Sequence, residues 1–200
     1  KMYRDCPKQF YHSNVPKKGH PERVEFVQTK QMVAGNLIDD ALTKRISLGT
    51  PLPPQYAPYE GVAQAVLAAP GVKYTQMKIT LDQAFQSCGY FDPQAWVRVI
   101  YDIAVINGTR GFLGDWKNGQ IWLDEEQLRL FATVGFHYFP ELEVIDTAYI
   151  WLAHGVTSDK TYHRRELPDL WQTFLPDVER LQISFRTNHW PAEPKRGGKT

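Results

Sequence analysis

The dipeptide Asn107-Gly108 constrains the fold of this chain more than any other feature of its sequence. It directly follows residues 95–106, which are rich in β-branched and aromatic side chains, and a second strand-like run, residues 111–117, comes shortly after it. Asn-Gly between two such runs is typical of the tight turn of an antiparallel β-hairpin. The sequence therefore predicts a hairpin at this point and a fold with β-strands at its centre.

The two strands of this hairpin carry charged residues that a strand built for burial does not need. Asp102 interrupts the first strand, and Asp115 and Lys117 stand two residues apart in the second. Side chains two residues apart in a strand point to the same face, so Asp115 and Lys117 share one side of the sheet. Whether Asp102 joins them depends on the length of the loop.

A two-residue loop at 107–108 places Asp102 opposite Leu113 and diagonal to Asp115. A four-residue loop at 107–110 places it directly opposite Asp115, with the two Cβ atoms about 5 Å apart. A three-residue loop turns Asp102 to the other face unless a bulge restores the register. Both even-numbered loops gather two carboxylates and one ammonium group on one face.

Two carboxylates this close repel each other unless positive charge lies between them. A hard divalent cation with oxygen ligands, Mg²⁺ or Mn²⁺, would relieve the repulsion, and Lys117 could then hold a nucleophilic water or stabilise charge on a phosphate. The simpler alternative is an Asp–Lys ion pair on a solvated face, with Asp102 an ordinary strand-edge residue. Spacing alone leaves both interpretations open.

Five segments between residues 6 and 131 carry short motifs in a fixed order. They are Cys6-Pro-Lys-Gln-Phe-Tyr11 (C-P-x-x-F/Y), Gly35-Asn-Leu-Ile-Asp39 (G-x-x-x-H), Val99-Ile-Tyr-Asp-Ile-Ala-Val-Ile106 (an aspartate strand), Gly114-Asp-Trp-Lys-Asn-Gly119 (D-Y-K-T-G) and Gln127-Leu-Arg-Leu-Phe131 (Q-x-x-x-Y). In order and spacing they resemble the PD-(D/E)XK nuclease superfamily, in its RecB-like and phage exonuclease branch.

The resemblance implies an α/β fold with a restriction-endonuclease-like core: a small mixed β-sheet flanked by helices, with an N-terminal helical lobe. It also implies a Mg²⁺- or Mn²⁺-dependent nuclease that hydrolyses phosphodiester bonds of DNA, with exonuclease action as the favoured mode. Asp102, Asp115 and the backbone carbonyl of Trp116 would bind the metal. Lys117 would orient the attacking water, and Gln127 would position the substrate or Lys117. The branch suggests a bacterial or phage-infected cell.

Two positions depart from the family pattern. Asp39 stands where the family has a metal-binding histidine, and it is a further candidate ligand because a carboxylate can also bind the cation. Gln76, in Thr75-Gln76-Met77-Lys78, stands where the family has a glutamate, and it could support a metal-bound water. The rival hypothesis is therefore a catalytically impaired nuclease-fold protein that binds nucleic acid without cleaving it.

Several of these candidates also have structural explanations. Asp39 lies in a predicted helix over residues 28–48, where it could pair with neighbouring side chains or solvent. Gln127 completes the capping-box pattern Asp124-Glu-Glu-Gln127, in which its side chain reaches back to the helix N-terminus. Arg164 and Arg165 could contact phosphates of the substrate, although paired surface arginines are also simply solvated. These alternatives stay open in the sequence.

We predict one domain over residues 1–186, followed by a loose tail, residues 187–200. Within the domain we expect a helical lobe over 28–70, a sheet core with one helix over 72–165 and C-terminal helices over 167–186. Residues 1–27 are polar, and their prolines predict irregular structure. Residues 161–165 are expected to form a short strand after a turn at 154–160.

Composition narrows the class of protein. With 42% hydrophobic and 22% charged residues the chain is ordinary globular protein, and its net charge of +1 neither demands nor excludes nucleic acid. Its two cysteines form no disulfide framework, which favours a reducing, cytoplasmic setting, and they do not support the iron–sulfur cluster of some RecB-like nucleases. The apolar runs are too short for a membrane span. Protein partners remain unknown.

Overall fold

The structure, a computed structural model, describes residues 2–122 and 125–192. Its elements in chain order are α1 (Met2–Asp5), α2 (Pro7–Asn14), α3 (Lys30–Leu48), the 3-10 helix η1 (Pro54–Tyr59), α4 (Glu60–Ala68), β1 (Val72–Leu81), β2 (Val97–Asn107), β3 (Arg110–Lys117), α5 (Glu125–Tyr138), β4 (Val144–Trp151), β5 (Val156–His163), the 3-10 helix η2 (Arg164–Glu166), α6 (Leu167–Gln172) and α7 (Leu175–Thr187). They confirm the predicted α/β class.

The chain divides into two compact units. Residues 30–170 form one, which holds the whole sheet, and the second combines the N-terminal residues up to 29 with the C-terminal segment from residue 171. The single domain predicted over residues 1–186 spans parts of both units. One backbone hydrogen bond between them joins Lys8 N to Pro191 O at 3.1 Å.

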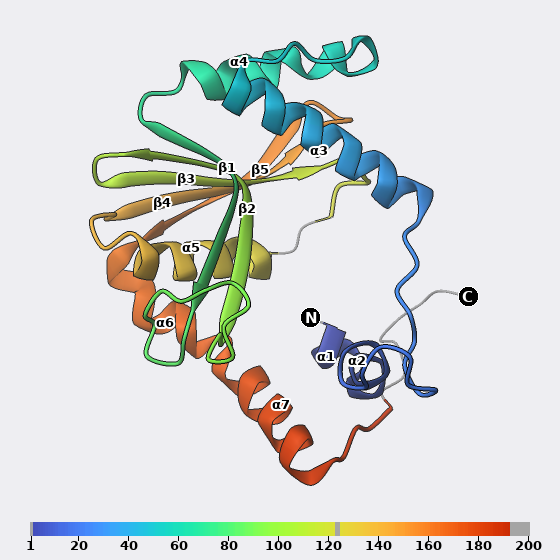
Figure 1. Cartoon of the computed structure of the whole chain (residues 1–200). Helices are drawn as coiled ribbons and strands as arrows, with labels where there is room; N and C mark the ends of the chain where they lie inside the picture. Colours follow the sequence, from blue (N-terminus) through green and yellow to red (C-terminus); the bar gives the residue numbers. More distant parts are fainter. Residues whose placement is uncertain (1, 123–124, 193–200) are drawn as a thin grey trace. The chain divides into compact units, whose positions relative to one another are not determined.

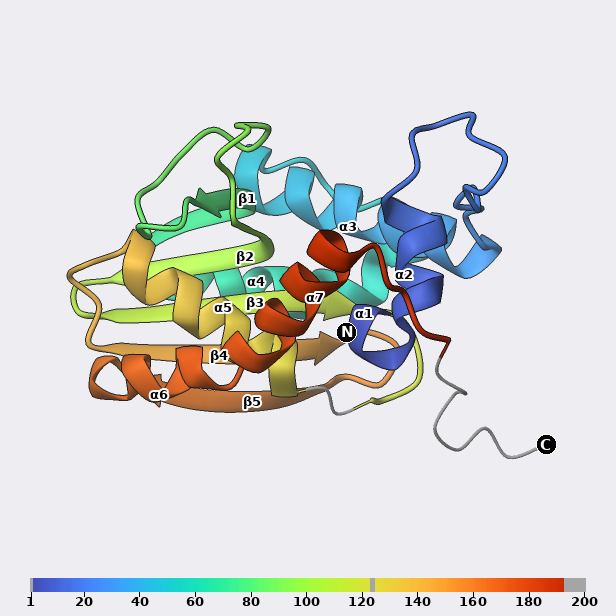
Figure 2. The same cartoon turned by 90° about the horizontal axis from the view of Figure 1, so that it is seen from below.

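The first unit is built on a five-stranded sheet with the strand order β1-β2-β3-β4-β5. Neighbouring strands are antiparallel except β3 and β4, which run parallel. Parallel neighbours need a crossover connection, and α5 supplies it between β3 and β4. Figure 1 shows α3 and α4 on one side of the sheet and α5 on the other, and Figure 2 shows α5 lying along the strands.

Each face of the sheet has its own apolar core. On the α5 face, Leu113, Phe131 and Ile145 belong to one buried cluster. On the other face, Ile38 and Leu42 of α3 pack with Trp116 in a second cluster. The buried residues of α3, Ile38, Ala41, Leu42 and Ile46, recur at the spacing of one helical face, which explains why this segment forms a helix on the sheet.

The β2–β3 hairpin closes with a two-residue loop, residues 108–109, between Asn107 and Arg110. Gly108 has a φ of 56°, a left-handed conformation that glycine adopts without strain. The resulting register pairs Ile103 with Gly114. It equals the register predicted for a four-residue loop, with one further pair formed between Asn107 and Arg110.

Side-chain alternation is interrupted where β1 and β2 carry Gln76 and Asp102. In β2, Tyr101 packs on the α5 face, yet Ile103, two residues on, packs on the opposite face. Gln76 has a φ of 49° and has no strand partner in the β1–β2 ladder, although its neighbours Thr75 and Met77 pair with residues of β2. At this break β1 and β2 bend away from β3, β4 and β5 (Figure 1).

Two predictions about the elements are wrong. Residues 1–27 are not wholly irregular, because α1 and α2 lie there; Pro7 begins α2, where its missing N–H costs nothing, and Cys6 Sγ accepts a hydrogen bond from Gln9 N at 3.4 Å. The last strand is not a short segment at 161–165 but β5, eight residues long, ending at His163.

In the described part of the chain, no helix has both the length and the apolar character that crossing a membrane requires.

Candidate functional site

The ladder between β2 and β3 ends at Ile103–Gly114, one step before Asp102 would pair with Asp115. The carboxylate of Asp102 takes over from the backbone there: its Oδ2 accepts a hydrogen bond from Trp116 N at 2.8 Å. Asp102 therefore does not pair with Asp115 in the described β2–β3 ladder, although the sequence predicts this pair for a four-residue loop. It reaches β3 at the break in the sheet.

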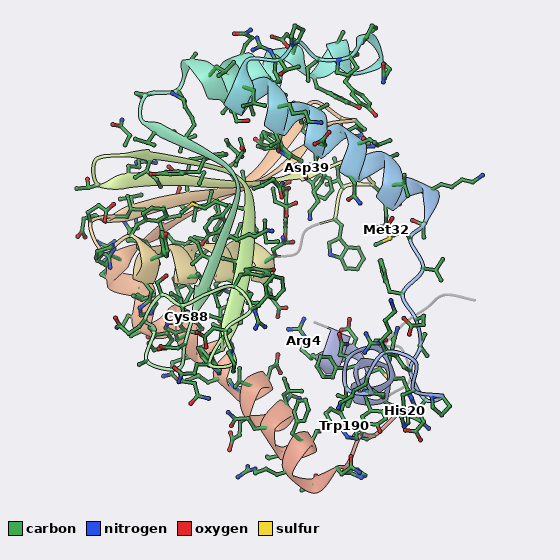
Figure 3. The ribbon with its side chains drawn as sticks, in the orientation of Figure 1. Arg4, His20, Met32, Asp39, Cys88 and Trp190 are labelled. Carbon is green, nitrogen blue, oxygen red and sulfur yellow. The ribbon has the colours of Figure 1, made fainter. Side chains whose placement is uncertain are left out.

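Gln76 links Asp102 to helix α3. Its Nε2 lies 2.9 Å from Asp102 Oδ1 and 2.8 Å from both carboxylate oxygens of Asp39. Asp39 sits on the side of α3 that faces the sheet (Figure 3). The left-handed backbone of Gln76 turns its side chain toward both acids. Three residues distant in sequence are thereby joined by one amide group.

Asp115, Lys117 and Gln127 form the other half of the site. Asp115 is 7% exposed; its Oδ2 lies 2.6 Å from Lys117 Nζ and its Oδ1 accepts from Gln127 Nε2 at 2.7 Å. The prediction that Asp115 and Lys117 share a face is confirmed by this ion pair. Gln127 lies in the first turn of α5, directly above the end of β3. Its amide is thus engaged by the site; Asp124, the other half of the predicted capping box, lies outside the described residues.

The acids of the two halves repel one another. Burial is the largest cause that raises the pKa of Asp102, to about 7, and the charges of Asp115 and then Asp39 add to it. Burial likewise raises the pKa of Asp39 to about 6, with a further contribution from Asp115, while the hydrogen bond from Gln76 acts in the opposite direction. Proton uptake or a cation would relieve this repulsion.

Asp39, Asp102 and Asp115 offer carboxylate oxygens at this site. Carboxylate oxygens are the groups that Mg²⁺ and Mn²⁺ prefer. Oδ2 of Asp115 is buried and accepts no hydrogen bond of good geometry, although the Lys117 ammonium lies beside it. Among the described residues, no group of three or more His, Cys, Asp or Glu side chains is already arranged as a metal-binding cluster. Gln76 and Lys117 lie against these carboxylates.

Arg164 and Arg165, the two predicted phosphate-contacting residues, follow β5, and Arg164 makes its hydrogen bonds away from the acids of the site. Arg164 donates to the carbonyl oxygens of Phe136 and Phe139 (3.1 and 2.7 Å), at the C-terminal end of α5, and to Leu142 O (2.5 Å). Gln127 is at the opposite end of the same helix. Arg164 thus holds the end of α5, where helix carbonyls lack partners, and Arg165 is exposed.

The indole ring of Trp116 packs in the core cluster with Ile38 and Leu42 of α3, and its backbone N–H is the group that donates to Asp102. Cys88 lies in the loop at residues 82–96, at the far end of β1 and β2 from Asp39 (Figure 3). Sequence reasoning missed Tyr149, whose hydroxyl donates to Gln127 Oε1 at 3.2 Å. Only the parallel pairing of β3 with β4 brings Tyr149 beside Asp115, and no motif marks that pairing.

Comparison with solved structures finds the same fold in the crystal structure of a "putative exonuclease" from Eubacterium rectale. The two align with a TM-score of 0.50 and 11% sequence identity, over 88% of this chain and 74% of that one. No protein-family model and no curated protein matches the sequence. At this identity the likeness shows a shared fold, a mixed five-stranded sheet with flanking helices, in a protein named as an exonuclease.

Proposed function

We propose that this chain is a nuclease of the PD-(D/E)XK superfamily, RecB-like branch, that hydrolyses phosphodiester bonds of DNA with Mg²⁺ or Mn²⁺. The observation that carries the proposal is that Gln76 joins the carboxylates of Asp39 and Asp102, while Asp115, whose charge acts on both of these acids, is paired with Lys117. The motif order in the sequence supports it, and so does a structural neighbour that is named as an exonuclease.

Asp102 and Asp115 are the proposed metal ligands, with Asp39 and the carbonyl of Trp116 as further candidates. The cation would supply a Lewis acid for the phosphate and lower the pKa of the attacking water. Asp102 is pre-positioned by Trp116 N and by Gln76, and Asp115 by Gln127, so neither carboxylate has to be ordered when substrate arrives.

Lys117 is the proposed group that acts on the reacting atoms. Its ammonium is anchored by Asp115, and the Lys117 side chain is one-third exposed to solvent. A positive donor held in this way can orient a water for attack on phosphorus and stabilise the charge that develops on the phosphate oxygens. Gln127 completes the arrangement by holding Asp115 in place.

The test is an assay of end-labelled single- and double-stranded DNA with Mn²⁺, with Mg²⁺ and with a chelator, sampled over time. Cleavage should need the divalent ion, and Asp115→Asn or Lys117→Met should each lower the rate by about 100-fold or more. Asp146→Asn is the matched control, because Asp146 is also paired with a cation, Arg110, but lies at the other end of the sheet.

The pattern of released label separates exonuclease from endonuclease action and shows strand preference. Metal-independent cleavage would contradict the proposal, and so would variants of Asp115 and Lys117 with the rate of Asp146→Asn.

One observation favours a second candidate, a protein that binds nucleic acid without cleaving it. The amide of Gln76 engages oxygens of both Asp39 and Asp102, where a glutamate would add a fourth carboxylate. This candidate predicts DNA binding with no cleavage under any divalent ion. It further predicts that Gln76→Glu combined with Asp39→His creates metal-dependent cleavage. Robust cleavage by the unaltered chain would exclude it.

A further inference from the structure

Tyr149 occupies a place in this site that none of the motifs assigns. It lies in β4 next to Asp115 of β3, and it is 2% exposed. Its hydroxyl donates to Gln127 Oε1 at 3.2 Å, and its ring centroid lies 5.1 Å from Lys117 Nζ. One rigid, buried side chain therefore contacts two of the residues proposed to act.

The orientation of the Gln127 side chain matters because its carboxamide has a donor end and an acceptor end. In the structure Nε2 faces the carboxylate of Asp115 at 2.7 Å, while Oε1 faces the Tyr149 hydroxyl, with Lys117 Nζ at 3.5 Å. A flipped amide would point its oxygen at the carboxylate and its NH₂ group at the ammonium. The carboxylate and the ammonium therefore select the observed orientation, and the Tyr149 hydroxyl, which donates to Oε1, anchors the amide in it.

The ring of Tyr149 has a separate effect on Lys117. An ammonium group within about 6 Å of an aromatic ring centroid is attracted to the electron-rich face of the ring. Together with Asp115, this contact fixes the position of Lys117 Nζ above β4. Phenylalanine would preserve the ring contact and remove only the hydroxyl, so the two roles can be separated by substitution.

We infer that Tyr149 is a positioning residue of this site: its hydroxyl anchors the Gln127 amide and thereby holds Asp115 and Lys117 in their working geometry. The inference rests on the proposed function for its consequence in catalysis, but the contact itself can be tested without activity. Tyr149 touches no reacting atom in this scheme and acts only through Gln127 and Lys117.

The experiment compares Tyr149→Phe with Tyr101→Phe in the DNA cleavage assay. Tyr101 is a matched control, because it is also fully buried and its hydroxyl also donates to α5, but to the backbone carbonyl of Phe131 at 2.9 Å. Tyr149→Phe should lower kcat about tenfold with KM within about twofold, and Tyr101→Phe should leave kcat within about twofold.

A double-mutant cycle then asks whether Tyr149 acts through Gln127. In a Gln127→Ala background, adding Tyr149→Phe should change kcat by less than about twofold, because the partner of the hydroxyl is already gone. A purely structural role would give the same loss in both backgrounds. Equal losses, or a kcat unchanged by Tyr149→Phe alone, would overturn the inference while leaving the nuclease proposal intact.

A second measurement tests the contact between Tyr149 and Gln127 without any cleavage of nucleic acid. The side-chain NH₂ resonances of Gln127, assigned by their loss in Gln127→Ala, report the hydrogen bonds of that amide. Tyr149→Phe should shift these resonances and speed the exchange of their protons with solvent about tenfold, whereas Tyr101→Phe should not. Resonances identical to those of the unaltered protein would overturn the inference, independently of activity.

Discussion

Asp102 performs two tasks with a single carboxylate. One oxygen replaces a backbone acceptor for Trp116 N where the strand ladder stops, and the other accepts from Gln76. The same group is half-buried near two further acids, which makes its charged form costly. Asp102 therefore stabilises the fold through its hydrogen bonds and destabilises it through its negative charge. Only the charge depends on pH.

We expect the metal-free protein to become more stable as pH falls from 8 to 5. The pKa values of Asp39 and Asp102 in the folded protein, about 6 and about 7, exceed their ordinary value of 3.8. Groups with raised pKa bind protons more tightly in the folded state, so their contribution is fully present below about pH 4 and is lost as pH rises through 6 and 7.

The change should be on the order of 4 kcal/mol, seen by urea unfolding in the presence of a chelator at a series of pH values. The double substitution Asp39→Asn with Asp102→Asn should flatten this dependence. A free energy of unfolding that rises toward pH 8 would contradict the assignment of these two groups.

At the scale of elements, helix α5 joins the site to the rest of the sheet. Its first turn carries Gln127 over Asp115, and its last carbonyls are held by the guanidinium of Arg164. The ring of Phe136 lies beneath that guanidinium at 5.1 Å, which further fixes it. Arg164, which the sequence suggests as a phosphate contact, therefore caps the C-terminal end of α5.

Arg164→Met should therefore lower the free energy of unfolding by about 2 kcal/mol, since it leaves helix carbonyls without their charged partner. Affinity for DNA, measured by fluorescence anisotropy on the folded protein, should stay within about twofold. Arg165→Met is the neighbouring control and should leave stability within about 0.5 kcal/mol. A variant of Arg164 that keeps its stability but loses DNA affinity would restore the phosphate-contact hypothesis.

At the scale of the whole molecule, the sequence predicts the elements better than their assembly. The bounds of β1 follow from alternation, and the hairpin of β2 and β3 follows from Asn107-Gly108. The break at Gln76 and Asp102 could not be predicted, because a left-handed backbone at a glutamine has no local signal. Tyr149 was missed for a different reason: its neighbours depend on a parallel strand pairing that spans α5.

Metal binding should stabilise the whole molecule. A ligand that binds only the folded state adds about 2.7 kcal/mol when its concentration is about 100-fold above Kd. We expect Mn²⁺ at pH 8 to raise the thermal unfolding midpoint of the unaltered protein and of Asp146→Asn, but not of Asp115→Asn. Equal shifts in all three proteins would show that the ion binds elsewhere.

The Asp102 side chain accepts the hydrogen bond from Trp116 N that a strand backbone would otherwise accept. This affects how mutations at Asp102 should be interpreted. A change at this position removes a backbone acceptor and a charge together, so loss of activity there cannot by itself reveal chemistry. The side chain of Lys117, which is one-third exposed at the end of β3, does not replace a backbone hydrogen-bonding group. In a library of random variants, inactive clones altered at Lys117 should still yield folded protein, whereas those altered at Asp102 should be scarce among soluble clones.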